Sequence, residues 1–299
     1  MRINLSQLSS TQTGSSLGHE ASYIDFQTCT EHISALFSSP VTDDSIYSLC
    51  GRLDEAIAYF NYDTIELCIH SPGGSVAALK YFNACRERWE NKGIRLRTIA
   101  LNEACSAAAF MLSCGTLGER VAKSHSTLVY HFGRLSSENV FGHMQSQTGG
   151  QLTAKRSKQA VDKLLSLQRM MVNEDEYLLG YLFQHIFGDA RKANAWAKFE
   201  ALERLAWAKQ WLKGLARNKS VLPPLNEACL AQMRKTANRL QRVADSPEKL
   251  VEKVKEEICQ LFDRDEPIHA FMAYLLLLVD RIDGPGGTNM NNHFLGDQS

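Results

Sequence analysis

The sequence lacks an excess of charge of either sign, because 33 Lys and Arg residues are matched by 33 Asp and Glu residues. A general electrostatic attraction to nucleic acid or to an anionic membrane is therefore not expected. The hydrophobic share of 44% and the charged share of 22% exclude disorder of the whole chain and collagen-like repetition. The length of 299 residues allows one large domain or two ordinary ones.

The sequence also lacks paired cysteines and long hydrophobic runs. Its eight cysteines form no C-x-x-C pair and no Cys/His set at zinc spacing, which favours free thiols in a reducing cytoplasm. The longest apolar run, from Pro267 to Val279, has 13 residues, which is too short to span a bilayer and predicts a buried helix. The first twenty residues are polar, so a signal peptide is not expected, and we predict a cytoplasmic protein.

What the sequence does contain, from about residue 31, is an alternation of short strands and helices. This order predicts an α/β fold in which crossovers join parallel strands. The expected strands are His32–Ser38, Ile65–Ile69, Ile94–Leu101 and Ser126–Tyr130. The expected helices begin at Thr42 or Asp43, run over about 75–90, and cover 106–114.

The composition divides the chain into four parts. A Ser/Thr-rich arm over 1–30 has little to bury and is expected to be mobile. The main domain follows over 31–217, and its stretch from about 133 to 190 holds an enlarged Gly/Ser/Gln-rich loop and a long helical arm. A helical C-terminal extension is predicted over 218–283, and a Gly/Asn-rich, disordered tail over 284–299.

One helix of the C-terminal extension has clear sequence signals. Ser246 followed by Pro247 is a good pair for a helix cap and first turn. Leu250, Val254 and Ile258 then recur at helical spacing and predict the buried face of this helix.

Three motifs in the main domain carry possible chemistry. The first is Ile69-His-Ser-Pro-Gly-Gly-Ser-Val76, a glycine turn at a strand end, where backbone N–H groups can point outward. The second is Asn102-Glu-Ala-Cys-Ser-Ala-Ala-Ala-Phe110, in which Ser106 lies between a strand and an Ala-rich helix. The third is Ser126-Thr-Leu-Val-Tyr-His-Phe132, in which His131 ends a strand and could act as a general base. Each motif alone also fits a structural role: a plain turn, an N-cap serine and a packed histidine.

Together the three motifs resemble the caseinolytic ClpP peptidase family of serine proteases. The separation of 25 residues between Ser106 and His131 matches this family, and the tract from Phe110 to Ala122 resembles its helix, Gly-x-x-Gly turn and strand. The resemblance is good from about 32 to 132, weak from 133 to 217, and not visible beyond. It implies a ClpP/crotonase-like superhelix of β-β-α turns, to which this chain adds a long helical arm and a helical C-terminal tail.

The resemblance assigns a role to each matching residue. Ser106 is the nucleophile and His131 the general base, and the backbone amides of Gly74 and Ala107 form the oxyanion hole. Gly73, Ser75 and Val76 line a groove in which the substrate adds as an extended strand. Cys105 beside the serine is interpreted as a packing residue, because its side chain should point to the opposite face.

The third triad member is less well marked. Counting back from Lys213-Gly214-Leu215, the family's aspartate falls beside Glu203, which is predicted to orient His131. Glu200 and Asp189 are rivals, and a solvated helix charge is the plain alternative for Glu203. The chain further departs from the family at His70, Asn102, Phe132 and Gly133.

The function predicted from the resemblance is a serine endopeptidase that acts on polypeptides within a homo-oligomeric ring and needs no cofactor or metal. The resemblance implies an ATP-driven unfoldase as a possible partner. The chain itself has no G-x-x-x-x-G-K-[ST] loop for binding ATP. Two alternatives stay open: an inactive ClpP-like structural or regulatory subunit, and a crotonase-like acyl-CoA enzyme. The latter would need neither Ser106 nor His131.

Overall fold

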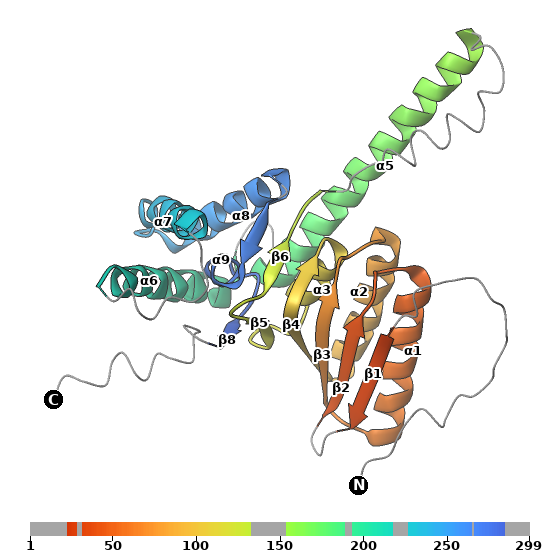
Figure 1. The fold of residues 1–299 in the computed structure, drawn as a ribbon, viewed down its shortest axis with the longest axis horizontal. Coiled ribbons are helices and arrows are strands. Elements are labelled where there is room, and N and C mark those ends of the chain that lie inside the picture. Colours follow the sequence, from red (N-terminus) through yellow and green to blue (C-terminus); the bar gives the residue numbers. More distant parts are fainter. Residues whose placement is uncertain are drawn as a thin grey trace.

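The structure is a computed structural model that describes residues 23–28, 32–132, 154–188, 193–217, 227–264 and 266–284. It has a mixed α/β architecture, as predicted, with a largely parallel sheet flanked by helices (Figure 1). The strands are β1 (Tyr23–Thr28), β2 (Ile33–Ser38), β3 (Thr64–Ser71), β4 (Arg95–Cys105), β5 (Arg120–Lys123), β6 (Thr127–Val129), β7 (Pro267–His269) and β8 (Arg281–Asp283). The helices are α1 (Asp43–Phe60), α2 (Val76–Asn91), α3 (Ala107–Ser113), α5 (Ala154–Phe187), α6 (Ala195–Arg217), α7 (Glu227–Gln241), α8 (Pro247–Arg264) and α9 (Ala270–Leu275).

The sheet places the two chemistry-bearing strand ends side by side. Strands β2, β3, β4 and β5 pair in parallel, as the strand–helix alternation predicts. Strand β4 is long enough to have two partners on one edge: residues 98–100 pair with β5, and residues 103–105 pair with β6. The end of β4, which Ser106 follows, therefore lies beside β6, which leads to His131.

The first two helices begin where the sequence predicts. Thr42 caps α1, because its side chain accepts a hydrogen bond from the backbone N–H of Ser45 at 3.1 Å, and Ser45 reciprocates as in a capping box. Ser75 caps α2 in the same manner through Ala78. Both helices lie against the sheet and bury their apolar faces (Figure 1).

The helix-forming stretch after residue 151 forms two helices, α5 and α6. Helix α5 extends out of the body of the molecule, as Figure 1 shows. The residue directly after this helix is Gly188, whose φ of 76° is a left-handed conformation that favours glycine. Helix α6 begins after Asn194, whose side chain accepts a hydrogen bond from Ala197 at 2.7 Å. The loop predicted over 135–150 lies outside the described residues.

The N-terminal arm contains one element that the sequence did not predict. Residues 23–28 form β1, which pairs antiparallel with β2 at the edge of the sheet. The sequence Tyr-Ile-Asp-Phe-Gln-Thr has a partial alternation of apolar and polar residues, a pattern that suits an edge strand. The prediction of a mobile arm over 1–30 did not include this strand.

The C-terminal extension joins the same sheet. Helix α8 starts as predicted, with the Ser246 carbonyl accepting from Leu250 at 2.9 Å, and Leu250, Val254 and Ile258 form its buried face. The predicted single helix over Pro267 to Val279 is wrong, however: the segment forms β7 and the short α9. An apolar run without helical periodicity does not separate helix from strand.

The strands of the extension have specific partners. Strand β7 pairs antiparallel with β6, and β8 pairs in parallel with β5. Between α9 and β8, Leu277 adopts a positive φ of 64°, where the chain changes direction. The extension is therefore a mixed element that completes the sheet and its core, and not a purely helical tail.

Candidate active site

Ser106 lies at a strained corner between β4 and α3. Its φ of 54° and ψ of −127° are unusual for a residue with a side chain, and such strain is concentrated at functional sites. The serine side chain makes no capping hydrogen bond to α3, which argues against the plain N-cap interpretation. Its backbone N–H donates to the carbonyl of Val129 in β6 at 2.7 Å, which holds the corner against the neighbouring strand.

The glycine turn after β3 is pressed against this corner. A Cβ added to Gly73 would lie 2.6 Å from the Ser106 Cβ and would overlap the carbonyl of Cys105 even more closely. Two hydrogen bonds to Val41 hold the turn in place. The Val41 N–H donates to the Gly73 carbonyl at 2.8 Å, and the Val41 carbonyl accepts from the Ser75 N–H at 2.7 Å. Gly73 is therefore required for the close approach of two backbone segments, with φ of 88°.

Two backbone N–H groups at this junction are available to a ligand. Gly74 follows the residue that contacts Ser106, and Ala107 is the first residue of α3. Within the described ranges, neither N–H donates to a backbone carbonyl. Donors without an internal acceptor beside a serine can stabilise an oxyanion, so both residues fit the predicted oxyanion hole.

His131 lies two residues after β6, the strand that pairs with the end of β4. Its Nδ1 lies 2.7 Å from the carbonyl oxygen of Phe132, and because a carbonyl only accepts, Nδ1 carries the proton. The Nε2 lone pair is then free to accept a proton from a hydroxyl. No hydrogen bond joins His131 to Ser106 among the described residues; such bonds often tighten only when substrate is bound.

The structure does not join Glu203 to His131. Glu203 lies exposed on α6, and no hydrogen bond or ion pair between the two is found in the part of the chain described. The rival Glu200 accepts from Arg204 at 2.9 Å, and Asp189 lies outside the described residues. The role of Glu203 as the triad acid therefore stays a prediction.

Cys105, the residue before the serine, is poorly suited to act as a nucleophile. Burial raises the pKa of its thiol, and the neighbouring Glu103 carboxylate raises it further. Since the thiolate is the reactive form, this environment favours Ser106 over Cys105.

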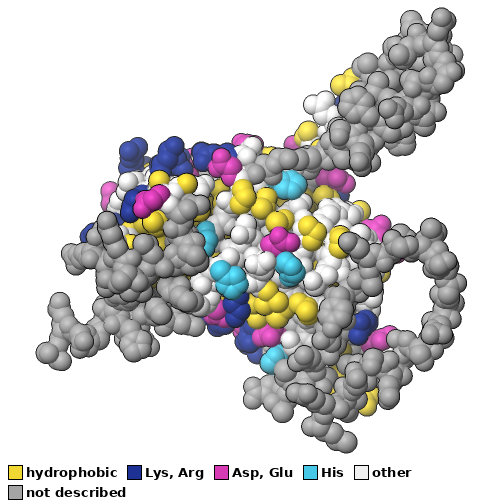
Figure 2. Space-filling view, viewed as in Figure 1, with side chains coloured by type: hydrophobic (Ala, Val, Ile, Leu, Met, Phe, Trp, Pro, Cys, Tyr) yellow, Lys and Arg dark blue, Asp and Glu magenta, His cyan; other side chains and the backbone are white. Residues whose placement is uncertain are grey.

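The predicted groove residues differ in exposure. Gly73 is buried, whereas Ser75 and Val76 are half-buried at the start of α2. Figure 2 shows histidine side chains among apolar and polar ones on the viewed face of the molecule. The groove assignment stays a prediction.

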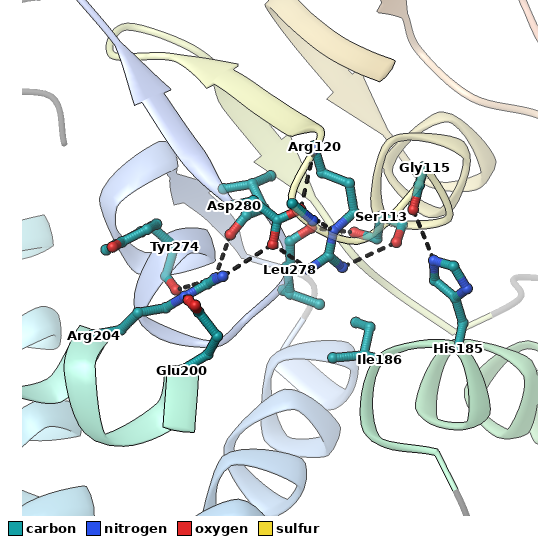
Figure 3. Close-up of polar contacts among 12 residues, drawn as sticks. Ser113, Gly115, Arg120, His185, Ile186, Glu200, Arg204, Tyr274, Leu278 and Asp280 are labelled. Carbon is teal, nitrogen blue, oxygen red and sulfur yellow. Dashed lines mark hydrogen bonds and ion pairs between the residues drawn. The ribbon is translucent and has the colours of Figure 1, made fainter. Parts of the chain in front are cut away.

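A buried charge cluster, which the sequence interpretation missed, connects the main domain to the extension (Figure 3). Asp280, just before β8, pairs with Arg120 of β5 at 2.6 Å and with Arg204 of α6 at 2.9 Å. Burial alone would raise the pKa of Asp280, but the two guanidinium groups outweigh it and hold the pKa well below its usual range. The only signal of this cluster in the sequence is Asp280 itself, a single aspartate directly after a long apolar run.

His185 makes a second contact at this end of the sheet. Its Nε2 donates to the carbonyl of Gly115, just after α3, at 2.8 Å (Figure 3). Burial, reinforced by Arg86 and Arg120, lowers the pKa of His185 to about 4, so the ring is neutral at pH 7. The contact therefore anchors the long helix α5 to the body.

Other kinds of site find no support in the described ranges. They contain no group of three or more His, Cys, Asp or Glu side chains arranged to hold a metal ion. No disulfide links the described cysteines. Among the described helices, none combines the length and the apolar character that crossing a membrane requires.

Comparison with known proteins points to one family. A family model described as Clp protease matches residues 18–173, just over half of the chain. The ATP-dependent Clp protease proteolytic subunit 2 of Nocardia farcinica is 33% identical over 91 residues, covering 30% of this chain and 43% of the relative. Subunit 1 of Cutibacterium acnes is 32% identical over 93 residues, covering 31% and 42%.

A third relative extends the match. Subunit 4 of Streptomyces avermitilis is 29% identical over 144 residues, which is 44% of this chain and 61% of the relative. The chain thus spans about half the length of the curated relatives that it matches.

Proposed function

The chain belongs to the Clp protease family, and from this premise we propose that it is a serine endopeptidase that hydrolyses unfolded or small polypeptides. The observation that carries the proposal is the strained corner at Ser106, with Gly73 packed against it and His131 two residues after the adjoining strand β6. Strain at a serine whose side chain does no structural capping is best explained by a chemical role.

The proposed reaction proceeds in two halves. Ser106 Oγ attacks the peptide carbonyl carbon while His131 Nε2 takes the hydroxyl proton, and the oxyanion accepts hydrogen bonds from Gly74 and Ala107. The C–N bond then breaks as His131 gives the proton to the leaving amine, which leaves an acyl ester on Ser106. A water molecule, deprotonated by His131, hydrolyses the ester. Each oxyanion donor contributes on the order of 3 kcal/mol to lowering the barrier.

The orientation of His131 has two candidate sources. The Phe132 carbonyl holds the proton on Nδ1, which leaves Nε2 as the base. Glu203, proposed from the family resemblance, would have to reach the same nitrogen. A Glu203→Gln variant decides between them: loss of a triad carboxylate lowers kcat by about 10,000-fold, whereas little change supports the carbonyl.

The substrate and assembly proposals follow from the family. We propose that an extended polypeptide binds along Gly73, Ser75 and Val76, and that the fold is a superhelix of β-β-α turns. The relatives are named ATP-dependent proteolytic subunits, so we propose a homo-oligomeric chamber that works with an ATP-driven unfoldase in the cytoplasm. The unpaired cysteines of the described ranges fit a reducing compartment.

Peptide hydrolysis tests the proposal. The purified full chain, alone and with an unfoldase of its host, is assayed on fluorogenic peptides and on an unfolded protein. We expect cleavage that Ser106→Ala and His131→Ala each lower by at least about 1000-fold. Ser34→Ala, a half-buried serine on β2, is the control and should leave cleavage unchanged. Cleavage that survives in Ser106→Ala would refute the mechanism.

The inactive-subunit alternative rests on one observation. Within the described residues no carboxylate contacts His131, unlike in a complete Ser-His-Asp triad. Cleavage absent from the chain alone, and restored by a second ClpP-type subunit even when Ser106 is alanine, would favour this alternative.

A further inference from the structure

A single side chain of the C-terminal extension contacts both catalytic elements. Phe262, near the end of α8, is only 2% exposed. Its ring lies 5.2 Å from Phe110 of α3, the helix that follows Ser106. It also lies 5.7 Å from Tyr130 and 5.4 Å from Phe132, measured between ring centroids. Tyr130 and Phe132 are the two neighbours of His131 in the chain.

These contacts bear directly on the proton of His131. The carbonyl that accepts from His131 Nδ1 belongs to Phe132, and the Phe132 ring is packed on Phe262. Movement of Phe132 would carry its carbonyl away from the imidazole. Without a fixed acceptor at Nδ1, the neutral ring can carry its proton on Nε2 instead. A protonated Nε2 cannot accept a proton, so it cannot serve as the base.

We propose that Phe262 is a positioning residue for His131: by clamping Phe132, the C-terminal extension keeps the histidine in its basic tautomer and aligned with Ser106. The inference rests on the proposed serine peptidase function. It assigns the extension, which has no visible resemblance to the peptidase family, a role in catalysis. A ring that only filled the core would stabilise the fold without affecting the tautomer.

Two variants and one control separate positioning from stability. Phe262→Ala removes the ring, and Phe262→Leu keeps an apolar side chain that can support Phe132 in part. Leu250→Ala is the matched control, because Leu250 is fully buried at the other end of the same helix. All three lower the melting temperature, so a purely structural effect would affect them alike.

Two readouts are measured on each full-length variant. The first is the tautomer of His131, from the ring ¹⁵N shifts of the histidine-labelled protein, with the signal assigned by His131→Gln. The second is the rate at which a fluorophosphonate modifies Ser106. We expect the Nδ1–H form in the wild type and in Leu250→Ala. Phe262→Ala should show mixed tautomers and label about tenfold slower or more, and Phe262→Leu should recover part of the rate.

The outcomes distinguish this inference from the proposed function. A wild-type tautomer and labelling rate in Phe262→Ala, or the same loss in Leu250→Ala, would overturn the positioning role. If Phe262→Ala does not fold, the comparison of Phe262→Leu with Leu250→Ala decides by the same criteria. No labelling of the wild type, together with a tautomer change in Phe262→Ala, would retain the positioning role and reject the peptidase.

Discussion

At the scale of single residues, the site depends on backbone conformations that few side chains tolerate. Ser106 has a positive φ, and Gly73 leaves no room for a Cβ between its own turn and the serine corner. Both features bring Ser106 and the two backbone N–H groups that we propose as oxyanion donors together before any substrate binds. Such preorganisation contributes to catalysis because no free energy is spent on rearrangement during the reaction.

Gly73→Ala tests this close approach. The added methyl group must push the turn away from Ser106, so we expect kcat/KM to fall by about 100-fold. Gly93→Ala is the matched control, because Gly93 has a similar φ of 79° but nothing within 4 Å of an added Cβ. It should lose stability without losing activity. Peptide hydrolysis and thermal unfolding measure both, and equal activity in the two variants would contradict the argument.

At the same scale, the sequence predicts the local parts of the candidate site and does not predict the distant ones. Ser106, His131 and Gly74 were predicted because each belongs to a short motif at a strand end. Phe262 was not predicted, because its contact with Phe132 joins residues far apart in the chain. The strain at Ser106 was also invisible, since no sequence pattern reports a positive φ at a serine.

At the scale of elements, helix α5 is attached to the body through His185. The imidazole of His185 is neutral in the folded protein because its pKa is lowered to about 4. In the unfolded chain its pKa is about 6.5. Between these values the unfolded state binds more protons, so stability falls as the pH falls. At pH 4 this effect lowers the free energy of unfolding by about 3 kcal/mol.

His185→Gln is expected to remove this part of the acid sensitivity. Glutamine can still donate to the Gly115 carbonyl but does not titrate, so the free energy of unfolding should fall less between pH 6.5 and 4 than in the wild type. His32→Gln, at the start of β2, is the control. Urea unfolding at several pH values provides the measurement, and identical pH profiles for wild type and His185→Gln would contradict the assignment.

Most element boundaries followed from local signals. The helix starts expected at Thr42 or Asp43, at about residue 75 and at Ser246-Pro247 all agree with the structure. The apolar run from Pro267 failed, because tertiary pairing with β6 determines its first residues and an apolar composition fits strand and helix alike. Strand β1 was missed because a short edge strand has little to distinguish it from a polar arm.

At the scale of the whole molecule, the main domain and the extension form one structure. Strands β7 and β8 extend its sheet, and the cluster of Arg120, Asp280 and Arg204 holds the extension from inside. The depressed pKa of Asp280 means that its stabilising contribution is present near neutral pH and is lost progressively as the pH falls below about 4. The extension is therefore expected to be essential for folding of the main domain.

Asp280→Asn tests this coupling. It leaves the buried guanidinium of Arg120 without a counter-charge and that of Arg204 with Glu200 alone, so we expect a loss of about 3–5 kcal/mol in the free energy of unfolding. Asp283→Asn, in a partly exposed pair with Lys123 and Arg281, is the control and should cost less than about 1 kcal/mol. Equal losses in urea unfolding would show that the buried cluster does not couple the two parts.

The most direct test of the central claim is covalent trapping of the nucleophile. The full chain is incubated with a fluorescent fluorophosphonate, and the modified residue is identified by peptide mass spectrometry. The account predicts one adduct on Ser106, absent from Ser106→Ala, strongly reduced in His131→Ala and unchanged in Cys105→Ala. A folded wild-type chain that remains unmodified, with or without an unfoldase of its host, or an adduct on another residue, would contradict it.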